Sequence, residues 1–415
     1  MSRSRSPRSS QVASSAGPKL EPKRARALRL VTELMRIPGQ SGEEAEVASA
    51  IIAHLRAAGL AESRIKQDQA HRKTRIPGQI GNLIVTLPGT FRGPRRMLSA
   101  HLDTVPICVG SRPKRQGNQI VAASAATGLG ADNRAGCAVL LNTLLQILEE
   151  SLPHPPLTFC WFVQEEVGLQ GVRWANTKLW SQPQLAFNWD GGSASKLTIG
   201  ATGAYRLRLT VSGRASHAGV APERGVSAIA IAALAIADLQ KRGWHGLVQH
   251  DGQRGTSNVG VIAGGQATNV VTDQVTLRAE ARSHDPVFRK RILNEIEEAF
   301  RRAAAEVRNV DGQAGGVELE STLDYESFLL PANESCVLIA DAAIRAVGRE
   351  PERVVASGGL DANWITAFGV PAVSLGCGQL NQHMTTEALD IEEFFAACHI
   401  ALLLASPSSS GSVAS

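Results

Sequence analysis

The sequence predicts an α/β fold in which a mostly parallel sheet with flanking helices carries an inserted second domain. At 415 residues the chain is long enough for two domains. Short, continuous apolar runs alternate with helical segments, as strands buried on both faces of a parallel sheet do. The continuous apolar runs lie at 157–163 and 185–188, and two further strand-like segments lie at 82–87 and 96–102. After about residue 200 the pattern changes to alternating apolar and polar residues, and the α/β pattern resumes at about residue 332.

The helices of the sheet domain follow from apolar residues at helical spacing. Two helices are expected between residues 23 and 60, and Ser41 with Glu44 suggests a capping box for the second. A strongly apolar helix is expected over 130–150, between the second and third strand-like runs. The alternation of strands and helices favours a doubly wound sheet.

The segment after residue 200 has the strand and helix order of a ferredoxin-like α+β unit. The expected elements are strand 204–212, helix 225–241, strands 257–262 and 274–281, helix 286–307 and strand 317–323. Because this unit interrupts the sheet domain, we expect a lid placed over the site. The expected divisions are a disordered basic tail at 1–22, a catalytic domain in two parts at 23–200 and 326–405, a lid and dimerisation domain at 201–325, and a disordered Ser/Gly tail at 406–415.

Basic residues gather near the amino-terminal end of the chain. The first 30 residues hold eight Lys or Arg and one Glu, a local charge of +7. Subtracting it from the total of +5 leaves −2 for the remainder. No aromatic residues interleave with these basic residues, so we expect no nucleic-acid partner.

The sequence favours a cytoplasmic protein with no membrane partner. The longest Ala- and Ile-rich stretch, 226–239, is shorter than the roughly 18–20 residues of a membrane span. The amino-terminal segment lacks the apolar region of a secretory signal, although its Ser and Arg content also allows an organellar transit peptide. The six cysteines stand singly without a C-x-x-C motif, which is typical of a reducing compartment.

Imidazole and carboxylate side chains follow several of the apolar runs. In an open α/β sheet, ligands bind outside the carboxyl ends of the strands, so these side chains predict one shared site. Nitrogen and oxygen ligands without thiolates suit zinc, cobalt or manganese. The candidate positions are His101 with Asp103, Asp132, Glu165 with Glu166, Asp190 and His383.

Most of these positions also have an ordinary structural explanation. A His-x-Asp triplet ends many strands without binding metal, and Asp132 stands where a helix N-cap would. The pair Glu165 and Glu166 is harder to explain in this way. Adjacent carboxylates after an apolar strand repel each other and lose hydration. The pair is explained if one carboxylate binds a cation and the other accepts a proton during catalysis.

Four stretches resemble the co-catalytic dizinc exopeptidases, the superfamily of peptidase T, carboxypeptidase G, aminoacylase and the acetylornithine and succinyl-diaminopimelate deacylases. Among these they are most similar to peptidase T. The stretches are HLDTVP at 101–106, QEEVGLQG at 164–171, HAGVAPE at 217–223 and GGLDAN at 358–363. The resemblance covers about residues 24–405 and implies a zinc-exopeptidase-like fold with a lid. Asn133, Arg134 and Leu360 depart from the family pattern, and Leu360 does so beside the substrate pocket.

The resemblance also implies two divalent metal ions, most simply Zn²⁺, with Co²⁺ or Mn²⁺ as alternatives. Asp103 would orient His101, since a carboxylate behind a metal-bound His fixes its tautomer. Glu165 would be the general base. The implied metal ligands are His101 and Asp190 for one ion, Glu166 and His383 for the other, and Asp132 as the bridge.

Three residues of the lid match family positions that contact the substrate. His217 would reach the active site of a partner subunit to stabilise the oxyanion, which implies a homodimer formed through the lid. Asn269 and Arg282 would hold the substrate carboxylate, a task that suits the guanidinium fork. Considered without the resemblance, the sequence favours an ordinary surface loop residue for His217 and a solvated strand-end charge for Arg282.

The function implied is hydrolysis of amide bonds in small peptides, most simply by an aminopeptidase of the tripeptidase T kind. A water bridging the metals would attack, and Glu165 would accept its proton. A carboxypeptidase or an N-acyl-amino-acid deacylase would use the same groups and is the alternative. A non-catalytic peptide-binding protein would be expected to have lost a ligand or the base, and none is missing here.

Overall fold

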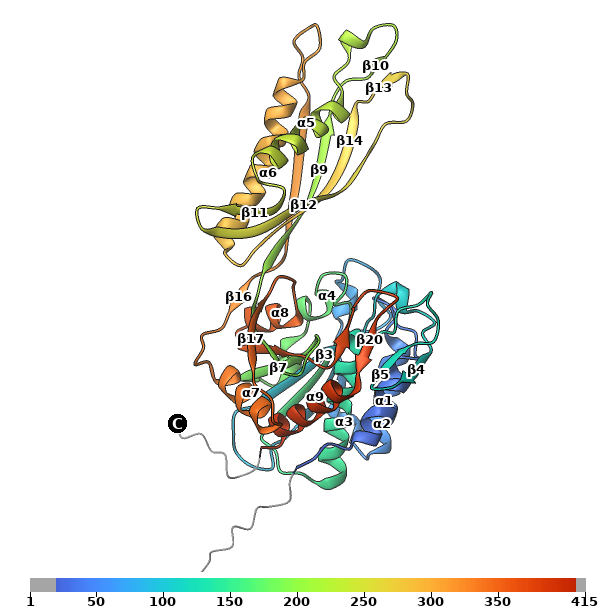
Figure 1. Cartoon of the computed structure of the whole chain (residues 1–415), viewed down its shortest axis with the longest axis vertical. Helices are drawn as coiled ribbons and strands as arrows, with labels where there is room; N and C mark the ends of the chain where they lie inside the picture. The colour runs from blue at the N-terminus through green and yellow to red at the C-terminus, as the bar shows by residue number, and fades with distance from the viewer. Residues whose placement is uncertain (1–19, 408–415) are drawn as a thin grey trace, which may run out of the picture.

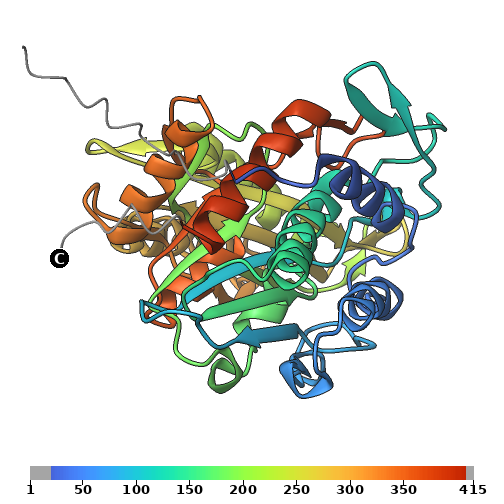
Figure 2. The same ribbon diagram turned by 90° about the horizontal axis from the view of Figure 1, so that it is seen from below.

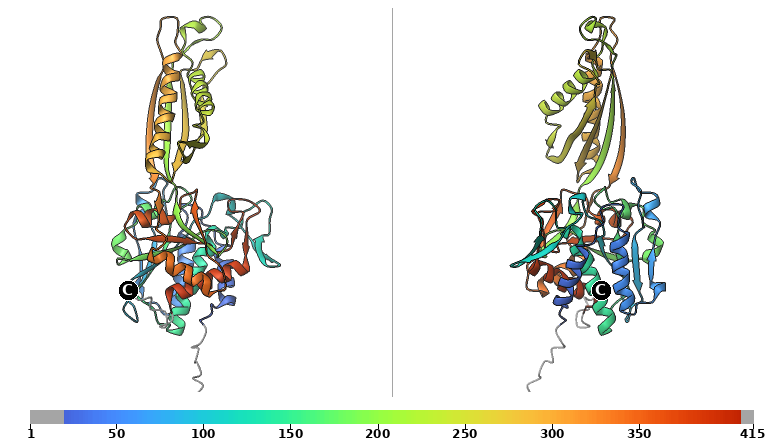
Figure 3. Two further views of the ribbon diagram at one scale, coloured as in Figure 1. Left: turned by 60° about the vertical axis from the view of Figure 1, so that its left-hand side comes forward. Right: turned by 90° about the vertical axis from the view of Figure 1, so that its right-hand side faces the viewer.

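The computed structural model describes residues 20–407, which form two bodies joined end to end (Figures 1 and 3). The larger body holds both chain ends of the described part, and the smaller body stands above it as an elongated domain. Residues 1–19 and 408–415, which contain most of the two predicted tails, lie outside the described part.

A nine-stranded sheet forms the centre of the larger body. Its strands are β1 (Ile65–Gln67), β2 (Leu83–Leu87), β3 (Arg96–His101), β6 (Leu157–Phe162), β7 (Leu185–Trp189), β8 (Lys196–Ala201), β16 (Phe328–Leu329), β17 (Glu352–Ala356) and β18 (Ala372–Leu375). The order is β1-β2-β6-β3-β7-β18-β8-β16, and β17 pairs with β8. Strands β6, β3, β7 and β18 run parallel, and every residue of β6 and β7 is buried. The predicted α/β fold class is confirmed.

Two groups of helices accompany this sheet. The first group contains α1 (Arg24–Leu34), α2 (Ala45–Ala57), α3 (Ala131–Glu150), α7 (Ser335–Ala346) and α9 (Ile391–Ala405). Helix α3 contacts α1, α2 and α9 as well as β3, and in the view from below it lies between α9, in red, and the blue α1 and α2 (Figure 2). Helix α8 (Asp361–Ala367) packs on β7 and β18 and contacts the short α4 (Gln170–Arg173). Because α3 is covered on all sides, its residues are buried from Ala131 to Ile147.

A small four-stranded sheet lies beside the central one and was not predicted from the sequence. It consists of β4 (Pro113–Gln116), β5 (Gln119–Ala122), β19 (Gln379–Leu380) and β20 (Ala388–Asp390), in the order β19-β20-β5-β4. Strands of two to four residues are too short to show a periodic pattern. This sheet brings the segment around His383 next to the loop that precedes α3.

The upper body is an antiparallel sheet covered by two helices. Its elements are β9 (Gly203–Ser212), α5 (Ala228–Lys241), β11 (Gly246–His250), β12 (Gln253–Gly264), β14 (Gln274–Ser283), α6 (Pro286–Glu306) and β15 (Gly316–Tyr325). The sheet order is β11-β12-β14-β9-β15. Leaving out β11, this is the β-α-β-β-α-β unit expected from the sequence. The hairpin strand β11 and the short pair β10 (Ser216–His217) and β13 (Val270–Val271) were not predicted.

Polar contacts hold the junction between the two bodies. The side-chain amide of Asn363, in α8, donates to the carbonyl of Thr202 at 3.0 Å and to that of Glu326 at 2.7 Å. These two residues flank the strands by which the chain enters and leaves the lid. Asp324, fully buried in β15, pairs with Arg75 of the larger body and Arg206 of the lid. Polar side chains therefore connect the lid to the larger body at its base.

Candidate metal centre

Four of the predicted ligands meet at the carboxyl ends of the central strands. One ligand atom from each of His101, Asp132 and Glu166 lies within 4.8 Å of the others. Nε2 of His383 lies 3.0 Å from Oε2 of Glu166 and 3.4 Å from Oδ2 of Asp132. His101 ends β3, Asp132 begins α3, and Glu166 follows β6. His383 comes from the turn between β19 and β20, nearly 220 residues away from Glu166 in the chain.

Asp190 follows β7, and its backbone N–H donates to the carbonyl of Leu375 at 2.9 Å. Burial, together with the charge of nearby Asp132, raises the pKa of the Asp190 carboxyl to about 7. Glu166 adds to the same effect, while His101 opposes it. A carboxyl whose charge is disfavoured by burial and by like charges is a suitable ligand for a cation that would neutralise it.

The donor set fits divalent cations. Oδ1 of Asp132 is buried and has no hydrogen-bond partner, although Nε2 of His101 lies 3.2 Å away. Burying a carboxylate oxygen without a partner is costly, and a shared cation would satisfy it. One or two imidazoles with several carboxylates, and no thiolate, suit zinc, cobalt or manganese.

Asp103 stands behind this group and makes more contacts than the sequence predicted. Nδ1 of His101 lies 3.1 Å from the backbone carbonyl of Asp103 and 3.4 Å from its Oδ1. The carboxylate itself accepts hydrogen bonds from the backbone N–H groups of Glu165 at 2.9 Å and Glu166 at 3.1 Å. Asp103 therefore fixes the turn that carries both glutamates, in addition to facing His101.

The capping box predicted at Ser41 and Glu44 is wrong. Helix α2 has no side-chain cap. The Ser41 hydroxyl donates instead to Oδ2 of Asp103 at 2.6 Å, and Oε1 of Glu44 accepts the backbone N–H of Gln164 at 3.0 Å. These two residues support the Glu165–Glu166 turn. The nearby sequence matches a capping box, and it could not reveal this role because the partners lie 62 and 120 positions away in the chain.

Glu165 lies at the same turn, half-buried. Burial, opposed by the charge of His101, raises the pKa of its carboxyl well above the usual value. Glu166 and Asp190 contribute in the same direction. A carboxylate of increased basicity suits a general base.

The lid residues are divided between its two ends. Strand β10, which ends at His217, and β13, which directly follows Asn269, lie at the end far from the larger body (Figure 1). The N–H of Ala218 there donates to the carbonyl of Asn269 at 2.9 Å. Arg282 lies near the other end of β14 and makes two hydrogen bonds to Glu280, at 2.8 and 3.0 Å. The ten residues of β14 span ~30 Å. Within one chain, the structure therefore separates His217 and Asn269 from the metal-ligand group.

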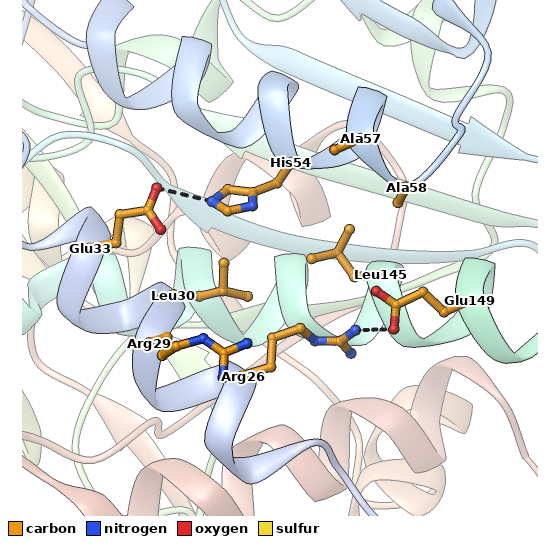
Figure 4. A pocket seen from close by; sticks show the side chains of 9 residues that line it. All are labelled: Arg26, Arg29, Leu30, Glu33, His54, Ala57, Ala58, Leu145 and Glu149. Carbon is orange, nitrogen blue, oxygen red and sulfur yellow. Dashed lines mark hydrogen bonds and ion pairs between the residues drawn. The ribbon is translucent and has the colours of Figure 1, made fainter.

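A surface pocket lies between α1, α2 and α3 and is separate from this group (Figure 4). Its lining includes Leu145, which is 13 helical residues, or ~20 Å, beyond Asp132. Two pairs of polar side chains in the pocket contact each other, His54 with Glu33 and Arg26 with Glu149. We assign it no ligand.

Comparison with known proteins agrees with the fold. The model of the M20 peptidase dimerisation domain matches residues 199–308, and that of peptidase family M28 matches residues 82–217. The uncharacterized protein YqjE of Bacillus subtilis is 31% identical over 369 residues, which are 89% of this chain and 94% of that protein. Peptidase T of Pasteurella multocida is 24% identical over 68% of this chain and 66% of its own.

Two solved structures share both the fold and about a third of the sequence. A tripeptidase from Staphylococcus aureus is 31% identical with a TM-score of 0.84, covering 93% of this chain and 98% of that one. Aminopeptidase PepT from Bacillus cereus is 30% identical with a TM-score of 0.80 over the same shares. The fold and site define a metallopeptidase of the dizinc exopeptidase class. Within this class the chain belongs to the peptidase T-like M20 peptidases.

Proposed function

We propose that this chain is an aminopeptidase that removes the first residue from small peptides with a free amino group. The observation that carries the proposal is the convergence of His101, Asp132, Glu166 and His383, from four distant segments, beside Glu165. The similarity to a tripeptidase and to an aminopeptidase over nearly the whole chain supports the peptide substrate.

The chain's own residues would then have separate tasks. We propose two zinc ions, with Asp132 between them; His101 and Asp190 would hold one ion, and Glu166 and His383 the other. Bound cations would acidify a water molecule and polarise the scissile carbonyl. Glu165 would take the proton from that water and deliver it to the leaving amine. Asp103 would keep both the His101 ring and the Glu165–Glu166 turn in place.

A homodimer formed through the lid would complete the site. Between residues 258 and 264, β12 pairs with β14 on one side, and no strand of residues 20–407 pairs with its other side. Ile229 of α5 lies next to Gly265, which directly follows β12, and it is exposed like Ile262. An open strand edge next to apolar side chains suits association with a second copy. A partner would also supply His217, Asn269 or both, which lie far from their own metal-ligand group.

The cysteines support a cytoplasmic location. All six are buried and unpaired in the described structure. Within residues 20–407 no helix is both long and apolar enough to cross a membrane. Free thiols throughout the core are typical of proteins that work in a reducing compartment.

Hydrolysis of matched peptides tests the proposal. Protein loaded with zinc would be given free di- and tripeptides, their N-acetylated twins and N-acyl amino acids. We expect turnover of the free peptides and its loss in Glu165→Gln. Turnover of the acetylated compounds alone would keep the site but contradict the aminopeptidase assignment in favour of a deacylase. No turnover with any compound would contradict the catalytic assignment.

A further inference from the structure

We propose that Glu387 is a positioning residue that ties the Asp132 loop to the His383 turn and thereby sets the spacing of the metal site. The proposal rests on the proposed ligand set, because it assigns metal binding to Asp132 and His383. Glu387 was not among the residues predicted from the sequence. It would act through these two ligands rather than by binding metal or substrate.

Both carboxylate oxygens of Glu387 bind the backbone just before α3. Oε2 accepts the N–H of Gly130 at 2.6 Å and that of Leu129 at 2.8 Å, and Oε1 accepts the N–H of Asp132 at 2.9 Å. The thiol of Cys108 lies 3.5 Å from Oε2 and adds a weaker donor. The Glu387 side chain is almost completely buried. These bonds fix the backbone on which the Asp132 carboxylate is mounted.

The same residue also closes the turn that carries His383. The backbone N–H of Glu387 donates to the carbonyl of Met384 at 3.1 Å, and the side chain of Asn381 donates to the carbonyl of Thr386 at 3.2 Å. Strand β20 begins directly after Glu387 and pairs with β5. The turn is therefore held internally, and Glu387 attaches it to the loop of Asp132, beside Gln379, whose side-chain amide donates to the carbonyl of Ala131 at 3.3 Å.

The chemistry of this contact requires a carboxylate. Burial raises the pKa of Glu387 and so does the charge of Asp132, while the backbone N–H groups act in the opposite direction. Glutamine would avoid the buried charge, but its NH₂ group is a donor and would face either the N–H of Asp132 or the N–H groups of Leu129 and Gly130. Only a carboxylate, in which both oxygens accept hydrogen bonds, matches the N–H groups that face Oε1 and Oε2. This explains a negative charge next to Asp132, where repulsion would otherwise disfavour it.

The test compares zinc binding by metal-free wild type and Glu387→Gln, measured by titration with elemental analysis of the ions retained. We expect Glu387→Gln to bind at least one ion about 10–100-fold more weakly, as loss of a group that orients a ligand does. Circular dichroism would show that the variant is folded. Glu387→Asp keeps the charge but is one methylene shorter, so it cannot reach both loops and should weaken zinc binding as well.

Asp68→Asn is the matched control. Asp68 is also a buried carboxylate that accepts three backbone N–H groups, those of Ala70 and Asn82 at 2.9 Å and Asn176 at 3.1 Å. It contacts neither the Asp132 loop nor the His383 turn in any of these bonds. We expect this variant to lose thermal stability while keeping wild-type zinc affinity. A purely structural role for Glu387 would make the two variants alike.

Wild-type zinc affinity in folded Glu387→Gln and Glu387→Asp would overturn the proposal. An equal loss of affinity in Asp68→Asn would also overturn it, because the loss would then follow from stability. Failure of the ligand set is distinguishable from both outcomes. In that case Asp132→Ala and His383→Ala would bind two ions as the wild type does.

Discussion

At the residue scale, the side chains that bear the chemistry are more predictable than those that support them. His101, Glu165 and Glu166 follow strands whose apolar pattern is plain, so their common location could be inferred from the fold class. Ser41 could not, because its nearby sequence matches a capping box and its actual partner is 62 residues away. Glu387 is similarly hidden, since its donors are backbone groups that no residue type reveals.

Asp103→Asn should disturb the turn that carries both glutamates. An asparagine NH₂ facing the backbone N–H of Glu165 or Glu166 would push the turn away, since two donors would meet. We expect kcat to fall about 10–100-fold with KM little changed. Steady-state kinetics on a free tripeptide measure this. Ser41→Ala, which removes only one donor to Asp103, should have a smaller effect, and an equal effect would contradict this account.

At the element scale, periodicity predicted the long strands and helices but not the short ones. The lid strands β9, β14 and β15 each have ten residues, enough for alternation to show. Strands β19 and β20 have two and three residues, and they form only because β5 offers a partner. The sequence therefore could not show how the His383 turn reaches the loop of Asp132.

If the lid supplies His217 to the site of the partner subunit, two variants that are inactive alone should restore activity together. His217 would serve the partner's site, whereas Glu165 would serve its own. Unfolding and refolding His217→Ala together with Glu165→Gln should therefore produce mixed dimers with one intact site. Random pairing would restore about a quarter of the wild-type activity. Each variant refolded alone is the control, and the absence of any recovery in mixed dimers would contradict the shared site.

At the scale of the whole molecule, the carboxylates at the site make the metal-free protein sensitive to pH. Burial is the largest cause that raises the pKa of Glu44 and Asp190 to about 7 and that of Asp361 to about 8. These groups ionise at 3.8 to 4.5 when unfolded, so the folded state binds more protons between pH 4 and 8 and its stability falls as pH rises. The pKa of His383 is raised to about 10, chiefly by Asp132 and Glu166. Its contribution to the stability of the folded state therefore also falls as pH rises above its unfolded pKa of 6.5.

Calorimetry at two pH values checks this prediction. The metal-free protein should unfold at a lower temperature at pH 8 than at pH 6. Asp132 does not change the direction of this effect between pH 6 and pH 8. Its pKa is lowered to about 2, so its stabilising contribution to the folded state is lost only below about pH 4. Zinc should stabilise the protein more at pH 8, where the ligands bind it with fewer protons to displace. Higher stability of the metal-free protein at pH 8 would be inconsistent with buried, uncompensated carboxylates.

The position of the lid relative to the site is a property of the whole molecule. It could not be predicted from the order of helices and strands along the sequence. The inserted unit was predicted, but the distance of His217 from its own ligand group depends on how the junction at Asn363 and Asp324 is built. Polar side chains that pair across a junction carry no periodic signal. The resemblance implied that His217 serves another subunit, and the separation of β10 from the metal-ligand group in the folded chain is consistent with that role.

Anomalous diffraction from crystals grown with zinc would test the proposed set of metal ligands most directly. We expect two zinc peaks, with Asp132 between them, His101 and Asp190 at one ion, and Glu166 and His383 at the other. A single ion at this site, or two ions held by other residues, would contradict it.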